Sequence, residues 1–587
     1  MLVLCFSIHG LAQRSSEITA RELKKDVGYL ASDSLKGRKP GTPEAGLAAS
    51  FIKKEFVADH LKLMCDKGYQ NFEIITDATA GPHNVLKFEG CTGEPGKDFT
   101  PLVYSSNAGV SAFVSFVGYG FDIKTDSLKW NDYAGIDVTG KWVIIFRADP
   151  ELDNSESKFI PFSELRGKVL TAKDHGAAGV LVVSTVALDK EDKLMALHTE
   201  NNDVTSGIPV IHIKRSVADL LLKSSGYKAD SLEKILNRNK SPKSFDLPQA
   251  NVYGVTDVIL KRTTTANVIG VLVGQDPVLK NEYIVVGGHY DHLGYGGPGS
   301  GSRMPDTVAI HNGADDNASG TAMVMELAGK IAAVKYNLKR SVIFVAFSGE
   351  EMGLLGSKYF VDHPPVDLKK IKAMFNFDMV GRFDKEKNSI SISGTGTSAE
   401  GDSILRLFEA GLPFAVTHSP DGYGPSDHAS FYSNNIPVFF FTTGVHMDYH
   451  TPLDDADKLD YEAEKTIGDF SSKLIMNVDQ MKKALTFKES GKKESGGRSG
   501  RRYKVTLGIM PDFAGSEKKG LRVDGVTKEG PADKGGMLKG DVIISINGMS
   551  VGNIYEYMSR LGKLGKGQTI SVEVIRNEKN VVLLIQL

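Results

Sequence analysis

The sequence predicts an α/β fold in which a mixed, mostly parallel sheet is sandwiched by helices. The first observation is a set of strand-length runs, most of them dominated by apolar residues, at 283–288, 341–347, 373–377, 389–393 and 437–441. The second is a predicted helix at 319–334, between the first two runs. Strands that are apolar throughout are buried on both faces, and helices between them supply the crossovers of a parallel sheet.

Composition agrees with a folded protein of several domains. The chain has 587 residues, of which 41% are hydrophobic and 24% charged, and this length corresponds to roughly three to four domains. The 70 Lys and Arg nearly balance the 72 Asp and Glu, which gives no sign of a nucleic-acid partner or a polybasic membrane surface. No apolar stretch reaches the roughly 18 residues that a membrane-spanning helix needs.

The first residues favour export. Residues 1–12 read MLVLCFSIHGLA, an apolar run followed by polar sequence, which is typical of the hydrophobic part of a signal peptide. We expect 1–14 to be a signal-peptide remnant and the protein to be secreted or periplasmic. The basic start of such a signal is missing, so the alternative is the apolar start of a cytosolic chain. Three cysteines are too few for a disulfide framework, although Cys65 and Cys91 could pair after export.

Three changes of character divide the chain. Residues 98–255 carry short β-rich runs separated by turns, and 488–502 read KESGKKESGGRSGRR, a flexible linker that cannot bury a core. The last residues, 503–587, form a separate β-rich unit. We therefore expect the main domain to consist of 15–97 and 256–487, interrupted by the 98–255 insert.

Acidic residues and histidines follow several of the predicted strands. These residues are His289, Asp315, Glu350, Glu351, Asp378 and His450. In an open α/β sheet, ligands bind at this end of the strands, and imidazole nitrogens and carboxylate oxygens suit zinc. Each residue alone has a structural explanation, such as a surface histidine or an acidic helix N-cap. Their joint occurrence favours a metal centre, and two histidines with three carboxylates could hold two zinc ions if one carboxylate bridges.

The surrounding segments carry a family resemblance. GGHYDHLG, GADDNASG, FSGEEMGLLGS, NFDMVGR, SDHASF and HMDYHTP together resemble the two-zinc exopeptidase family of bacterial leucyl aminopeptidase, aminopeptidase Y and glutamate carboxypeptidase II. The order and spacing match over about 255–485, and LKGRKPGTPEAG resembles the N-terminal segment of that family. The resemblance implies the zinc exopeptidase fold.

The resemblance also implies a ligand set for two Zn²⁺ ions. It makes Asp315 the bridging carboxylate, with a cis peptide bond to Asp316. The remaining ligands fall into two pairs, one pair for each ion: His289 with Asp378, and Glu351 with His450. Four residues are less favoured alternative ligands: His292, His311, His446 and Asp448.

Three further residues receive catalytic roles from the resemblance. Glu350 is the general base that takes a proton from a zinc-activated water and delivers it to the leaving amine. Asp291 orients the imidazole of His289. Tyr423 helps to polarise the substrate carbonyl, whereas His428 is interpreted as structural.

The other two units resemble known modules. Residues 98–255 resemble a protease-associated (PA) domain, which implies a place beside the cleft that limits substrate access. Residues 503–587 resemble a PDZ domain, with Leu507, Gly508 and Ile509 in the loop that captures a peptide C-terminus through backbone N–H groups. The alternative for this unit is a capping module without a ligand.

The predicted function is that of a zinc-dependent exopeptidase acting on peptides, and an aminopeptidase is favoured because an acidic site suits a free N-terminal amine. The runner-up is a carboxypeptidase or dipeptidase, in which Arg303 or Arg382 would hold the substrate carboxylate. A different class is a non-catalytic binding scaffold with PA and PDZ modules. The retained ligands and Glu350 argue against a scaffold.

Overall fold

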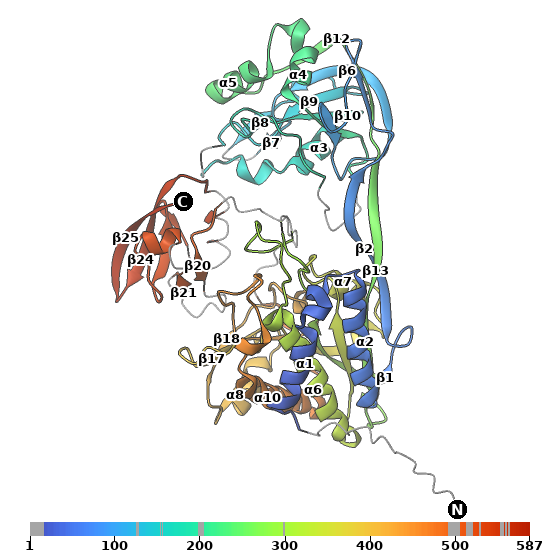
Figure 1. The fold of residues 1–587 in the computed structure, drawn as a ribbon, viewed down its shortest axis with the longest axis vertical. Helices are drawn as coiled ribbons and strands as arrows, with labels where there is room; N and C mark the ends of the chain where they lie inside the picture. Colours follow the sequence, from blue (N-terminus) through green and yellow to red (C-terminus); the bar gives the residue numbers. More distant parts are fainter. Residues whose placement is uncertain are drawn as a thin grey trace, which may run out of the picture. The chain divides into compact units, whose positions relative to one another are not determined.

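The computed structural model describes residues 17–587 with interruptions. The interruptions are 125–127, 153, 155, 198–204, 298–299, 491–504, 512–519, 527–529, 552–556, 558–559 and 562–563. The expected signal-peptide remnant and most of the expected linker lie outside the described residues. The chain divides into two compact units, 75–263 and the remainder (Figure 1).

The main unit contains a mixed nine-stranded sheet. Its order is β1-β13-β15-β14-β16-β19-β17-β18, and β2 pairs with β13. The bounds are β1 Lys62–Leu63, β2 Tyr69–Ala80, β13 Val258–Leu272, β14 Tyr283–His289, β15 Ser341–Phe347, β16 Ile371–Phe377, β17 Ser389–Ser393, β18 Ala415–Ser419 and β19 Val438–Thr442. Strands β15, β14, β16 and β19 run parallel, whereas β13 is antiparallel to β15 and β17 to β19. The predicted sheet is confirmed, and its parallel centre brings several strand ends to one edge.

Helices cover both faces of this sheet. They are α1 Ala20–Leu30, α2 Pro43–Ala58, α6 Gly320–Ala333, α7 Leu355–Asp362, α8 Gly401–Glu409, α9 His428–Tyr432 and α10 Tyr461–Gln480. Along β14, Ile284 and Val286 pack into the core shared with α1, α2, α6, α8 and α10, and Val285 packs into the core shared with α7 and α9. Both faces are therefore apolar, which is why this strand lacks an alternating pattern.

The second unit is built on an eight-stranded sheet of order β4-β3-β12-β6-β9-β10-β11-β5. Its strands are β3 Val85–Phe88, β4 Cys91–Thr92, β5 Phe99–Pro101, β6 Gly109–Val117, β9 Trp142–Phe146, β10 Gly179–Val183, β11 Val210–Ile213 and β12 Ser244–Val255. The hairpin β7 Asp122–Lys124 and β8 Lys129–Asn131, with helices α3 Leu165–Asp174, α4 Arg215–Leu222 and α5 Ala229–Asn239, completes it. The unit is wider than the expected 98–255, because β3 pairs with β12 across a long sequence separation.

The C-terminal residues form a third sheet of order β20-β21-β22-β24-β25, with β23 beside β22. The bounds are β20 Ile509–Pro511, β21 Leu521–Val526, α11 Pro531–Lys534, β22 Val542–Ile546, β23 Met549–Ser550, β24 Thr569–Arg576 and β25 Lys579–Gln586. The side chains of Leu507 and Ile509 are buried in the core of this sheet.

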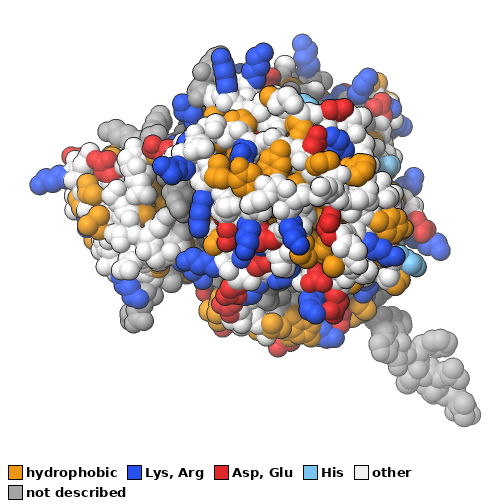
Figure 2. Space-filling view, turned by 90° about the horizontal axis from the view of Figure 1, so that it is seen from above, with side chains coloured by type: hydrophobic (Ala, Val, Ile, Leu, Met, Phe, Trp, Pro, Cys, Tyr) orange, Lys and Arg blue, Asp and Glu red, His pale blue; other side chains and the backbone are white. Residues whose placement is uncertain are grey.

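Three further features concern surface charge, membrane spans and cysteines. Figure 2 shows positive and negative side chains interspersed on the visible face, as expected for a net charge of −2. None of the helices within the described ranges is both long and apolar enough to cross a membrane. Cys65 and Cys91 are exposed free thiols.

Candidate metal centre

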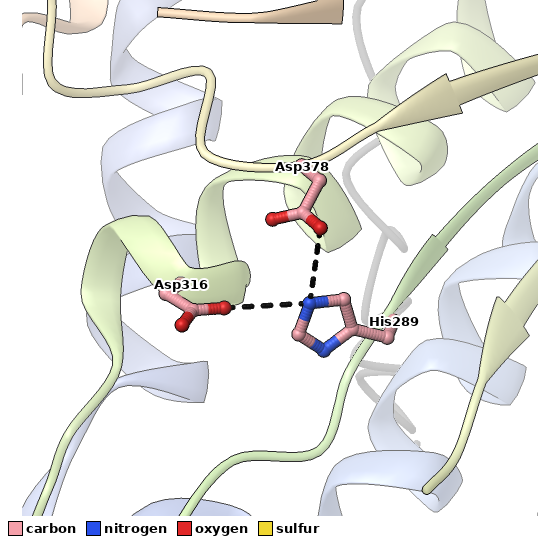
Figure 3. A group of neighbouring side chains, drawn as sticks. All are labelled: His289, Asp316 and Asp378. Atoms are coloured by element: carbon pink, nitrogen blue, oxygen red, sulfur yellow. Dashed lines mark ion pairs between the residues drawn. The ribbon is translucent and has the colours of Figure 1, made fainter. Parts of the chain in front are cut away.

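Histidines and carboxylates converge at the carboxyl end of the central strands. His289 is the last residue of β14 and is fully buried. Its Nε2 lies 3.3 Å from Asp316 Oδ1 and 3.5 Å from Asp378 Oδ2. Figure 3 shows this nitrogen between the two carboxylates, one from the turn before α6 and one from the end of β16.

A second group shares Asp316 with the first. The Nε2 of His450 lies 3.1 Å from Asp316 Oδ2 and 3.2 Å from Glu351 Oε2. The Nδ1 of His292 lies 2.8 Å from Glu351 Oε1 and 3.8 Å from Asp316 Oδ2. Asp316 therefore presents one oxygen to each group, and His292, an alternative in the sequence, lies as close to Glu351 as His450 does.

This geometry corrects the expectation for Asp315. Its Oδ1 accepts hydrogen bonds from the backbone N–H groups of Gly381 and Arg382 at 2.7 and 3.0 Å, and its Oδ2 lies 3.3 Å from His446 Nε2. Asp316 occupies the shared position instead, and the cis peptide bond joins Asp316 to Asn317, one residue later than expected. The two adjacent acids point in different directions, which residue spacing alone could not resolve.

A distant carboxylate holds the turn that carries Asp316. Asp454 Oδ2 accepts hydrogen bonds from the backbone N–H groups of both Asp315 and Asp316, each at 3.0 Å. Asp454 is itself fully buried. The direction of the Asp316 side chain thus depends on a residue far along the chain.

Asp291 lies beside His289. The Nδ1 of His289 is 3.2 Å from the Asp291 carbonyl oxygen and 3.8 Å from its Oδ1. The Asp291 carboxylate also accepts the N–H groups of Glu350 and Glu351 at 3.1 and 3.3 Å. Burial raises the pKa of Asp291 to about 6. This side chain therefore ties the end of β14 to the turn that follows β15.

The adjacent Glu350 and Glu351 have opposite electrostatic environments. Burial, with the neighbouring charges of Glu351 and Asp378, raises the pKa of Glu350 well above its usual range. Burial also acts to raise the pKa of Glu351, but the imidazoles of His450 and His292 outweigh it and lower that pKa to about 2. Two adjacent carboxyl groups whose surroundings shift their pKa values in opposite directions are the pattern of an acid–base site.

The donor set fits zinc. Within the described part of the chain, the Nε2 atoms of His289 and His450 are buried without a hydrogen bond of normal geometry. A buried ring nitrogen without a partner requires an explanation, and nearby carboxylate oxygens together with imidazole nitrogens form the ligand set that Zn²⁺ prefers. Two clusters meet the spacing that a metal requires, and both contain Asp316: His289, Asp316 and Asp378, and His292, Asp316 and Glu351.

Tyr423 and Tyr449 have different surroundings. The half-buried ring of Tyr423 packs edge-on against Tyr432, with ring centroids 4.7 Å apart. The ring of Tyr449 instead stacks on His450 at 3.9 Å, and burial with the charges of Asp316 and Glu351 raises its pKa well above the usual range. Sequence reasoning missed Tyr449, although it directly precedes His450.

The remaining sequence candidates lie around the two clusters. His428 is buried and stacks on Phe440 at 4.4 Å. The Nε2 of His311 lies 2.8 Å from the Ser302 hydroxyl. Arg382 pairs with Asp448 at 2.8 Å.

Family models match three segments of the chain. Residues 267–475 match Peptidase family M28, 99–221 match the PA domain and 505–587 match the PDZ domain. The part of the chain that carries the candidate metal ligands is thus similar to peptidase family M28. The resemblances to a zinc exopeptidase, a PA domain and a PDZ domain are thereby confirmed.

Proteins similar to this chain are named aminopeptidases. The chain is 25% identical to aminopeptidase YwaD of Bacillus subtilis over 463 residues, which cover 76% of this chain and 84% of the relative. It is 30% identical to leucine aminopeptidase 2 of Trichophyton rubrum over 200 residues, 32% of this chain, and it spans only 36% of that relative. The solved aminopeptidase of Aneurinibacillus sp. strain AM-1 is 23% identical, with 81% of this chain and 95% of that chain covered and a TM-score of 0.44.

Proposed function

We propose that this protein is a zinc-dependent aminopeptidase of peptidase family M28 that removes the N-terminal residue of peptides. The observation that carries the proposal is Asp316, whose two carboxylate oxygens face two separate groups of histidine and carboxylate ligands. The names of its relatives point to the same activity.

The proposed centre holds two zinc ions. His289, Asp316 and Asp378 would hold one, and Asp316, Glu351 and His450 the other, with His292 as a further ligand or a replacement for His450. Zinc supplies a Lewis acid that polarises the substrate carbonyl and makes water a nucleophile near neutral pH.

Asp291 prepares His289 for this role. A proton on His289 Nδ1 is donated toward the carbonyl oxygen of Asp291 at 3.2 Å. The lone pair of Nε2 is then free and faces Asp316 and Asp378. This is the usual arrangement of a metal-binding histidine.

Glu350 is the proposed general base. Its Oε2 lies 4.0 Å from His289 Nε2, so it stands beside the proposed ligands without belonging to either cluster. The carboxylate takes a proton from the attacking water and passes it to the nitrogen of the leaving amine, which completes hydrolysis.

A phenol would stabilise the negative charge that develops on the carbonyl oxygen. Tyr423 remains the residue predicted from the resemblance, and Tyr449 is a second proposal because its ring stacks on His450. Tyr423→Phe and Tyr449→Phe compared side by side would assign the role. The variant with the larger fall in kcat identifies the donor.

Charge favours an aminopeptidase over a carboxypeptidase. The carboxylates of Glu350 and Asp378 suit the ammonium group of a free N-terminus. The guanidinium of Arg382 is already paired with Asp448, which makes it a poor clamp for a substrate carboxylate. Arg303, the other residue considered for that role, has an exposed side chain.

The test is hydrolysis of one short peptide in free and N-acetylated forms, with and without a chelator. Cleavage of the free form alone, lost with chelator and restored by zinc, is the expected result. Cleavage of both forms would favour the carboxypeptidase alternative. A full zinc complement without cleavage of any tested peptide would favour the binding scaffold.

The PDZ domain is proposed to bind peptide C-termini. Leu507 and Ile509 direct their side chains into the core, so a ligand carboxylate would meet the backbone around Gly508. Deleting 488–587 tests recruitment by this domain. The deletion is expected to lower kcat/KM for long peptides but not for dipeptides. Unchanged kcat/KM for both substrates after the deletion would contradict recruitment.

Export is proposed from the apolar run at 1–12. Mass spectrometry of the mature protein would find its N-terminus near residue 13 if the run is removed. An intact first residue would contradict a cleaved signal.

A further inference from the structure

Arg38 is a fully buried arginine with four backbone carbonyl partners. Its Nε donates to Tyr290 O at 2.7 Å, its Nη1 to Leu30 O and to Asn312 O at 2.7 Å, and its Nη2 to Gly313 O at 2.9 Å. Such a planar group, with donors in a fixed fork, holds several acceptors in one geometry.

These partners are directly linked to the proposed metal ligands. Tyr290 lies between His289 and Asp291, and Gly313 begins the turn that presents Asp316. The side chain of Arg38 therefore links the backbone next to His289 to the turn that carries Asp316.

The backbone around Arg38 is in close contact with the chain near the proposed ligands. Lys36, Gly37 and Arg38 have φ values of 44°, 70° and 46°, a run of left-handed residues that favours glycine. The carbonyl of Gly37 accepts the N–H of Gly294 at 3.0 Å. A Cβ on Gly37 would lie 2.4 Å from the backbone oxygen of His311, so the turn is in close contact with the segment after His292.

Two effects of Arg38 on zinc binding oppose each other. Its charge lies near the carboxylates of Asp291 and Asp316 and would repel a second cation. Its hydrogen bonds hold the ligand segments in register and would favour that cation. Arg38→Met separates the two effects, because tighter zinc binding after removal of the charge and the hydrogen bonds together would mean that the charge dominates.

We propose that Arg38 is a positioning residue of the metal centre, which sets zinc affinity by fixing the segment of His289 relative to the turn of Asp316. This inference rests on the proposed function. It concerns the geometry of the protein around the ligands and does not require Arg38 to touch metal or substrate.

Arg340 provides a matched control. It is also fully buried and donates to backbone carbonyl oxygens, those of Val478 at 3.3 Å and of Asp479 and Met481 at 2.8 Å each. It precedes β15 at the opposite end from Glu350. Arg340→Lys, like Arg38→Lys, removes hydrogen bonds from a buried guanidinium to backbone carbonyl oxygens while keeping the charge. It differs in that Arg340 Nε also pairs with Glu282 Oε2 at 2.8 Å.

The experiment measures zinc affinity by competition with a chromophoric chelator, together with thermal unfolding of each metal-free variant. Arg38→Lys is expected to weaken zinc binding by about 10–100-fold, as other changes around metal ligands do. Arg340→Lys is expected to lower the unfolding temperature with zinc affinity within about twofold of wild type.

Three results would overturn the inference. They are an unchanged zinc affinity in Arg38→Lys, an equal loss of affinity in both variants, and tighter zinc binding by Arg38→Met, which would leave charge as the main effect. Wild-type protein that binds no zinc would instead overturn the proposed function itself.

Gly37→Ala is the second variant if Arg38→Lys does not fold. It keeps Arg38 but displaces its turn, so weaker zinc binding is again expected. If neither variant folds while Arg340→Lys does, the turn around Arg38 is required for folding as such. That result would overturn the inference.

Discussion

His289 in the main unit and His212 in the second unit are both buried histidines on parallel strands, yet their surroundings differ. The Nδ1 of His212 accepts the N–H of Met195 at 3.0 Å, and its Nε2 lies 2.9 Å from the Ser184 hydroxyl. Both of its ring nitrogens are therefore satisfied. The Nε2 of His289 instead faces the carboxylates of Asp316 and Asp378.

The difference shows why burial alone does not identify a site. Since Nδ1 of His212 accepts a backbone N–H, the proton must be on Nε2, which donates to Ser184. The serine is thus not activated by a base, and Ser184 also accepts a hydrogen bond from Arg147 at 2.9 Å. His212 completes the interior of its sheet, whereas His289 has a nitrogen directed at potential metal ligands.

The largest effect is expected from Asp316→Ala. It removes the carboxylate common to both clusters, so zinc content should fall and kcat/KM should drop by at least about 100-fold. Zinc analysis after dialysis and a peptide assay measure both. Asp315→Asn, which keeps an oxygen for the N–H of Gly381, is the control and should retain zinc. Loss of zinc from Asp315→Asn, with zinc retained by Asp316→Ala, would restore Asp315 as the shared ligand.

Glu350→Gln should separate catalysis from metal binding. Loss of the base is expected to lower kcat by about 10²–10⁴-fold, while zinc content stays unchanged because Glu350 lies in neither cluster. Steady-state kinetics at saturating substrate, with zinc analysis of the same sample, provide the measurement. Near-normal turnover would rule Glu350 out as the base.

His212→Asn should affect stability but not chemistry. The substitution removes the imidazole that pairs with Met195 N–H and the Ser184 hydroxyl. Leaving such buried groups without their partner costs about 1–3 kcal/mol of unfolding free energy. Zinc content and kcat should stay unchanged. Denaturant unfolding can be followed by tryptophan fluorescence, because both tryptophans, Trp130 and Trp142, belong to the second unit. Loss of zinc in this variant would break the distinction between the two histidines.

The pH dependence of that stability sharpens the comparison. Burial lowers the pKa of His212 from 6.5 to about 3, so the unfolded chain binds a proton at a higher pH than the folded one. The stabilisation is therefore complete above about pH 6.5 and is lost progressively as the pH falls toward 3. The unfolding free energy of wild type should fall more steeply than that of His212→Asn between pH 7 and pH 4.5. Parallel curves would contradict this assignment.

The smallest effect is expected from His175→Ala. This partly exposed side chain stacks on Tyr133 at 4.1 Å and lies 3.0 Å from Asp122. An exposed pair of this kind contributes about 1 kcal/mol or less, so the fluorescence transition should shift only slightly. A shift as large as that of His212→Asn would show that burial is not what separates the two residues.

Local sequence patterns predicted much of the fold. Apolar runs with no alternation identified the central strands, because a strand covered by helices on both faces needs apolar side chains on both. The same logic placed His289, Glu350 and Asp378 at one edge, since the carboxyl ends of parallel strands meet there. The extent of the second unit was less readable, because β3 joins its sheet by pairing with β12, more than a hundred residues away.

The sequence by itself determined which residue types gather at the carboxyl end of the sheet. Only the tertiary structure decided which of two adjacent acids, Asp315 or Asp316, faces the ligands, because Asp454 holds the backbone of that turn from a distant segment. Contacts between distant segments also brought Arg38 beneath the site. Spacing along a chain specifies period and order, whereas the direction of one side chain depends on hydrogen bonds that form only when the segments meet.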